Sequence, residues 1–183
     1  MSGHSRWSQV KHKKAITDAK KGQLFSKLVR EITVAACSGG PNPESNPGLR
    51  AALARARSIG LPKDSIERAV ARALGTEGDA LLQEFLYEAT APGGLMILIE
   101  GITDNKNRSL SGVKQILAKH GAKLVPQNSL LWNFEKTWND EGKDYTPKTR
   151  AEVSPGEKEK LVLLLDELSD HDDVQEAYTN LSD

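Results

Sequence analysis

The spacing of apolar residues changes near residue 76, and this change limits the possible folds more than any other feature of the chain. Before it, apolar residues recur every three or four positions, which is the period of an amphipathic α-helix. After it, alternating apolar and polar residues indicate β-strands. We therefore predict an α+β protein, with a helical domain over residues 1–75 and an α+β domain over residues 76–183.

Three helices are expected in the first domain, because its apolar stripes are separated by short segments rich in Gly and Pro. Gly39-Gly40-Pro41 is typical of the end of a helix, and Asn46-Pro47 is typical of the start of the next one. Together the three helices form a small bundle. The expected helices cover residues 13–36, 47–59 and 62–74.

The second domain is expected to be a mainly antiparallel sandwich with the order ββαββαβ. Ala91-Pro92-Gly93-Gly94 predicts a tight turn between its first two strands. Ser154 and Glu157 form a capping box that starts the last helix. We expect strands over residues 84–90, 95–102, 129–136, 148–153 and 174–179, helices over 109–120 and 155–170, and a loop over 137–147.

Residues that commonly carry catalysis or bind metals form no recognisable motif. The chain lacks the Gly-rich phosphate-binding loops and the Gly-x-Ser-x-Gly nucleophile motif, and its single Cys37 excludes an internal disulfide. The acidic residues between Asp170 and Glu176 could bind a cation, although a solvated helix end explains them more simply. We therefore expect no enzymatic activity, no metal and no cofactor.

Charge is distributed unevenly along the chain. Lys and Arg total 25 and Asp and Glu total 25, so the formal net charge is zero. Residues 1–75 nevertheless contain 14 cationic and 5 anionic residues, whereas residues 76–183 contain 11 and 20. Two explanations are open at this point: nucleic-acid binding by the basic domain, or attraction between two oppositely charged domains.

The N-terminal segment has the densest positive charge. Lys and Arg neutralise phosphates, while Trp and His contact exposed bases. Heptad spacing of the lysines predicts an exposed lysine face that is separate from the apolar face of the first helix. The candidate nucleic-acid-binding residues are His4, Ser5, Arg6, Trp7, Lys11, His12, Lys13, Lys14, Lys20, Lys21, Lys27 and Arg30, with Arg50, Arg55, Arg57, Arg68 and Arg72 as further candidates.

Other interpretations of this basic segment are weaker. A solvated helix face would have the same composition, with Trp7 packed against the bundle. A transit peptide is disfavoured because the segment is rich in Lys and continues into the first helix. Membrane binding would require large apolar side chains opposite the lysines, and the apolar runs are far shorter than the ~18 residues that span a bilayer. We expect a cytoplasmic protein without membrane contact, with the mitochondrial matrix as the alternative.

Ordered blocks of residues over nearly the whole chain resemble the YebC/PmpR family, which includes the mitochondrial translational activator of cytochrome c oxidase subunit I. The first blocks are Gly3-His4-Ser5-Arg6-Trp7, Lys11-His12-Lys13-Lys14-Ala15 and Asp18-Ala19-Lys20-Lys21-Gly22. The later blocks are Phe25–Leu28, Arg30–Ile32, Asn46–Arg50, Pro62–Ala69, Tyr87-Glu88, Ala91–Gly94, Thr103–Arg108 and Asp172–Gln175.

The resemblance implies a non-enzymatic regulator of gene expression. Bacterial members are described as DNA-binding transcriptional regulators, and the mitochondrial relative as a ribosome-associated translation factor. Family members usually have a third domain inserted within the second, and residues 137–147 form a short loop in its place here. The departure puts in doubt any activity that depends on that domain.

Three hypotheses follow for function. The first is a translation factor whose residues 3–30 contact rRNA or tRNA, and the second is a transcriptional regulator that binds duplex DNA with the same face. The third is a protein-interaction adaptor. The acidic domain would be repelled by phosphate, so we expect it to contact ribosomal or other basic proteins.

Overall fold

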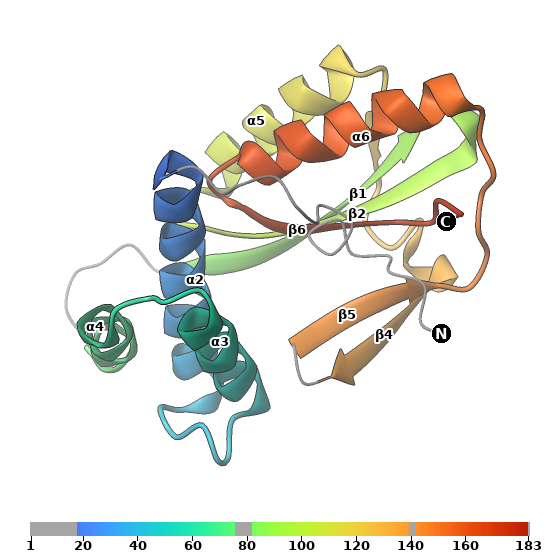
Figure 1. Ribbon diagram of the computed structural model, residues 1–183. Helices are drawn as coiled ribbons and strands as arrows, with labels where there is room; N and C mark the ends of the chain where they lie inside the picture. Colours follow the sequence, from blue (N-terminus) through green and yellow to red (C-terminus); the bar gives the residue numbers. More distant parts are fainter. Residues whose placement is uncertain (1–17, 76–81, 140–141, 183) are drawn as a thin grey trace. The chain divides into compact units, whose positions relative to one another are not determined.

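The computed structural model of the protein describes residues 18–75, 82–139 and 142–182 (Figure 1). These residues divide into two compact units. The helical unit comprises residues 18–75 and 82–83, together with 138–139 and 142–143 from a β-hairpin. The α+β unit comprises residues 84–137 and 144–182. The predicted α+β class is confirmed.

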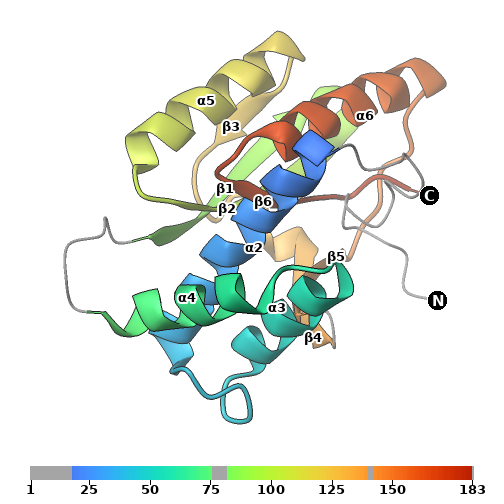
Figure 2. The same cartoon turned by 60° about the vertical axis from the view of Figure 1, so that its left-hand side comes forward.

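Helix α2 (Asp18–Gly39) forms the centre of the helical unit, and α3 (Pro47–Ser58) and α4 (Lys63–Leu74) both pack against it (Figure 2). The buried core is made of small and branched apolar side chains, among them Ile32, Leu49 and Ala52, which have no solvent exposure. Within the described ranges, no helix is both long and apolar enough to cross a membrane.

Asn46 connects the end of α2 with the start of α3. Its carboxamide nitrogen donates hydrogen bonds to the carbonyls of Ala35 (2.7 Å) and Gly40 (2.8 Å), and its oxygen accepts one from the backbone N–H of Leu49 (3.0 Å). The last of these is the N-cap bond expected from Asn46-Pro47. A Cβ atom at Gly39 would overlap the Asn46 side chain, so this helix junction requires glycine.

The α+β unit contains a four-stranded sheet with the strand order β3-β1-β2-β6. β1 pairs with β3 and β2 pairs with β6, both antiparallel. The turn between β1 and β2 is the predicted one, with φ of 80° at Gly93 and 75° at Gly94. The elements that lie wholly or mostly in this unit are β1 (Gln83–Ala91), β2 (Leu95–Thr103), α5 (Lys106–Lys119), β3 (Lys123–Val125), β4 (Phe134–Asn139), β5 (Gly142–Pro147), α6 (Pro155–Asp170) and β6 (Val174–Thr179).

Each face of this sheet has its own core. Helices α5 and α6 lie side by side on one face (Figure 1), where Ile97, Ile99 and Leu168 are fully buried. On the other face, Leu98 and Tyr178 pack against Phe134 and Tyr145 from the β4–β5 pair. The rings of Tyr145 and Tyr178 meet edge to face, with their centroids 5.0 Å apart.

Three details of the expected strand order are wrong. Residues 137–139 and 142–147, expected to be a loop, belong to the paired strands β4 and β5. Gly142, Asp144 and Pro147 are typical turn formers. The sequence therefore contains little sign that Tyr145, which lies between them, is buried in a strand. The strand expected at 148–153 is reduced to a single bridge between Ala151 and Leu181. A strand that was not expected, β3, follows α5. It is only three residues long and none of its residues is buried, so the sequence has no alternating apolar pattern there.

Candidate nucleic-acid interface

The first described turn of α2 carries two of the predicted lysines. Lys20 and Lys21 are both exposed. The ammonium of Lys21 lies 5.6 Å from the centroid of the Phe25 ring, which is a cation–π distance. The predicted site residues His4, Ser5, Arg6, Trp7, Lys11, His12, Lys13 and Lys14 lie outside the described residues.

Within the described part of α2, the lysines do not form the expected exposed face separate from the apolar face. Lys21 lies four residues before Phe25 and seven before Leu28, so it continues the apolar stripe towards the helix start. Lys27 is only 8 % exposed, and Val34, one heptad later, is buried as well. Positive charge on α2 is therefore concentrated at its N-terminal end, because the positions seven residues after Lys20 and Lys21, which are Lys27 and Leu28, are buried.

The arginines of the helical unit differ in their exposure and in the ion pairs and hydrogen bonds of their side chains. Arg30 is half-buried. Arg55 pairs with Glu31, which joins α3 to α2. The guanidinium of Arg57, which is exposed, makes no hydrogen bond or ion pair with any residue that the structure describes. The guanidinium of Arg68 donates to the carbonyl of Asp64 within the same helix (3.1 Å).

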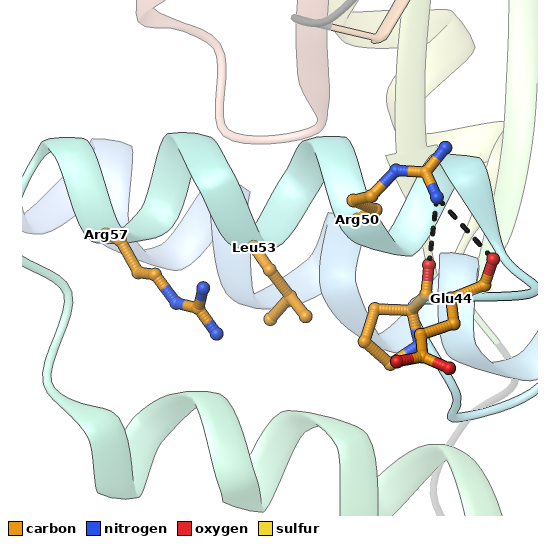
Figure 3. A pocket seen from close by; sticks show the side chains of 5 residues that line it. Glu44, Arg50, Leu53 and Arg57 are labelled. Carbon is orange, nitrogen blue, oxygen red and sulfur yellow. Dashed lines mark hydrogen bonds between the residues drawn. The ribbon is translucent and has the colours of Figure 1, made fainter.

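A pocket of about 310 Å³ opens beside α3 (Figure 3). Arg50, Leu53 and Arg57 line it from the helix, and Pro43 and Glu44 line it from the preceding loop. Arg50 and Arg57 are seven residues apart and therefore lie on the same side of α3, with Leu53 between them. The Nη1 atom of Arg50 is 3.5 Å from the carbonyl oxygens of both Pro43 and Glu44.

The α+β unit contains a polar cluster that sequence reasoning missed. Asp173 is 2 % exposed and accepts hydrogen bonds from the side chains of Ser109 (2.5 Å), Arg108 (3.0 Å) and Thr103 (3.1 Å). Burial acts to raise the pKa of Asp173, but these hydrogen bonds outweigh it and hold the pKa below its usual range. The sequence pattern favours a solvated helix end for Asp173 and its acidic neighbours. For Asp173 this explanation is wrong, because its carboxylate is buried and hydrogen-bonded.

A second polar cluster joins α5 to α6. Glu167 lies 2.7 Å from the imidazole of His120 and 2.9 Å from the ammonium of Lys119. Hydrogen bonds from His120 and Lys119 lower the pKa of Glu167, and the one from His120 has the larger effect. Across the described ranges, no three residues of the types His, Cys, Asp and Glu come together as a metal site would require.

The comparisons with known proteins decide which family these features belong to. The family model of the TACO1/YebC protein N-terminal domain matches residues 5–76, and the model of the TACO1/YebC second and third domain matches residues 82–139. The chain belongs to the TACO1/YebC family. The resemblance found in the sequence blocks is thereby confirmed, and the first model covers the basic segment and all three helices of the helical unit.

Relatives in the TACO1/YebC family are similar over nearly the whole chain. A "Probable transcriptional regulatory protein" of Dictyoglomus thermophilum is 36 % identical over 237 positions, covering 98 % of this chain and 95 % of the relative. One of Thermomicrobium roseum is 37 % identical, covering 100 % and 96 %. The crystal structure of a conserved hypothetical protein, Aq1575, from Aquifex aeolicus has a TM-score of 0.84 at 29 % identity and covers 96 % of both chains. Because the first alignment is longer than 183 residues, that relative contains residues without a counterpart here.

Proposed function

We propose that this chain is a non-enzymatic regulator of gene expression that binds folded RNA and acts as a ribosome-associated translation factor in the cytoplasm. The observation that carries the proposal is the set of exposed cations on the helical unit: Lys20 and Lys21 on α2, Arg50 and Arg57 on α3, and Arg68 on α4. Such cations neutralise phosphates and release counterions, which provides affinity without base-specific contacts.

Two carboxylates on α4 favour RNA over base-specific reading of duplex DNA. In a helix–turn–helix arrangement, the second helix places its first residues against base edges in the major groove. The first half of α4 carries Asp64 and Glu67, both exposed, and Glu67 lies 3.5 Å from Lys63. Phosphates on either side of the groove would repel these carboxylates. Folded RNA offers irregular backbone and unpaired bases that can be bound away from them.

A duplex-DNA-binding transcriptional regulator is the second candidate function. It is supported by the relatives named "Probable transcriptional regulatory protein", which are 36 % and 37 % identical to this chain over nearly its full length. The same exposed cations would serve this function, because duplex DNA also presents a regular array of phosphates.

The acidic α+β unit would contact protein and not nucleic acid. Residues 76–183, which include the whole α+β unit, contain 20 acidic and 11 basic residues, so the field around this part of the chain repels phosphate. Ribosomal proteins and other basic proteins are complementary partners. Such an arrangement would orient the helical unit towards the RNA.

Co-sedimentation with purified ribosomes, compared with a gel shift on random-sequence duplex DNA, tests the proposal. Both assays use the full chain at the same moderate salt concentration, because phosphate binding depends strongly on salt. We expect the chain to pellet with ribosomes and to shift duplex DNA only at much higher protein concentration.

The other outcomes are equally informative. A gel shift at lower protein concentration than ribosome binding would support the transcriptional regulator instead. Binding to neither ribosomes nor DNA would overturn both candidates and favour the protein-interaction adaptor.

A further inference from the structure

We propose that the pocket beside α3 binds one unpaired nucleotide of the target RNA, an inference that rests on the proposed function. Its lining combines two arginines, an apolar surface and a carboxylate within about 310 Å³ (Figure 3). This volume lies at the small end of the range for ligand pockets, which fits a single base with its ribose and phosphate. A base that is stacked and paired within a duplex cannot enter such a pocket, so the nucleotide must be unpaired.

The wall of the pocket is held in place before any ligand binds. The side chain of Asn42 accepts a hydrogen bond from the backbone N–H of Glu44 (2.9 Å), and the carbonyl of Asn42 accepts one from the hydroxyl of Ser45 (3.2 Å). Asn46 then fixes the end of this loop to both α2 and α3. Binding to such a preformed wall avoids the entropic cost of ordering a mobile loop.

The two arginines provide donors for a phosphate. The guanidinium of Arg57 donates to none of the described residues, and that of Arg50 uses only Nη1, at a long 3.5 Å from two carbonyl oxygens. A guanidinium carries five N–H donors in a planar fork that matches phosphate oxygens. We therefore place the phosphate between Arg50 and Arg57 and the base against Leu53.

Glu44 determines which bases fit best. Glu44 lines the pocket (Figure 3), and its carboxylate would repel a second phosphate but accept a hydrogen bond from an amino group of a base. Cytosine, adenine and guanine carry such an amino group, whereas uracil does not. The pocket should therefore bind oligocytidylate more tightly than oligouridylate.

The test measures binding of the full-length chain to fluorescent oligocytidylate, oligouridylate and an RNA duplex by anisotropy. The variant is Arg57→Gln, and the matched control is Lys63→Gln, which removes an exposed cation of the same unit that neither lines the pocket nor belongs to the candidate binding residues. We expect Arg57→Gln to weaken oligocytidylate binding about tenfold, the effect of losing one charge-assisted hydrogen bond. Lys63→Gln should weaken it less than about twofold, the level of a surface charge.

A second measurement on the wild-type chain avoids any effect of the variants on folding. Titration with cytidine 5′-monophosphate should shift the NMR signals of the Leu53 methyl groups and the Arg57 side-chain N–H. Uridine 5′-monophosphate should shift them less. Absence of these shifts at saturating nucleotide would overturn the inference.

The outcomes separate this inference from the proposed function. If Arg57→Gln and Lys63→Gln weaken RNA binding equally, these cations act only through their charge, and the nucleotide pocket is excluded while RNA binding stands. If the wild-type chain binds none of the RNAs, the proposed function fails and the pocket inference fails with it.

Discussion

The carboxylate of Asp173 accepts a hydrogen bond of 2.5 Å from the hydroxyl of Ser109, which joins the start of β6 to the first turns of α5. Thr103 at the end of β2 and the guanidinium of Arg108 donate to the same carboxylate. One buried charge thus connects three elements of the α+β unit that are far apart in the sequence. Its removal should affect stability more than any surface charge.

Asp173→Asn should lower the free energy of unfolding by about 1–3 kcal/mol at neutral pH, because a neutral amide leaves some of these donors without a charged acceptor. The folded-state pKa of Asp173 is lowered, so its charge stabilises the fold above the unfolded pKa of about 4. That contribution is lost as the pH falls through the folded-state pKa. Urea unfolding from pH 7 down to pH 3 measures both effects.

The pH dependence distinguishes the charge from simple packing. The stability difference between wild type and Asp173→Asn should be constant near neutral pH and should shrink as the pH falls below about 4. Asp172→Asn, an exposed neighbour, serves as the control and should change stability little. A difference between wild type and Asp173→Asn that stayed constant down to pH 3 would refute the role of the charge.

Asn46→Ala should destabilise the helical unit by about 1–3 kcal/mol. The change removes the N-cap bond to Leu49 and leaves the carbonyls of Ala35 and Gly40 without their donor. Asn42→Ala is the matched control, since it removes one exposed hydrogen bond to the backbone of Glu44. Thermal unfolding followed by circular dichroism measures both, and equal effects would contradict the role of Asn46 as the helix junction.

Local sequence signals predicted the elements whose ends depend on nearby residues. The Asn46 N-cap and the capping box of Ser154 and Glu157 are both present, and β6 has its expected bounds, 174–179. The Ala91–Gly94 turn could also be predicted, because Gly93 and Gly94 adopt the positive φ values that favour glycine in turns. In each of these cases the interaction that fixes the structure spans only a few residues.

Features that depend on long-range contacts could not be predicted in this way. The helical period alone gives no sign that Lys27 is buried, since lysine normally remains in solvent. The sequence also presents Asp173 as one of several acidic residues, although Ser109, its closest partner, is 64 positions away.

Gly101→Ala and Gly22→Ala should change stability in opposite directions. A Cβ atom at Gly101 would overlap the ring of Phe85 and the carbonyl of Asp173, at an irregularity in the β2–β6 pairing. Overpacking of this kind costs about 1–3 kcal/mol or more. Gly22 lies within α2 with open space around its Cβ position, so alanine there should stabilise the helix by about 0.5–1 kcal/mol. Urea unfolding of both variants checks the prediction, which a destabilised Gly22→Ala would contradict.

Replacing Lys13, Lys14, Lys20 and Lys21 with alanine should weaken nucleic-acid binding and flatten its salt dependence. Each phosphate contact contributes roughly 0.9 to the log–log slope for a duplex and roughly 0.7 for a single strand. The control variant removes four exposed lysines of the acidic unit, Lys114, Lys148, Lys158 and Lys160. It changes the net charge equally, so a general charge effect would alter both slopes alike. A smaller slope only in the first variant would show that its lysines contact phosphate, whereas an unchanged slope would exclude these lysines from the interface.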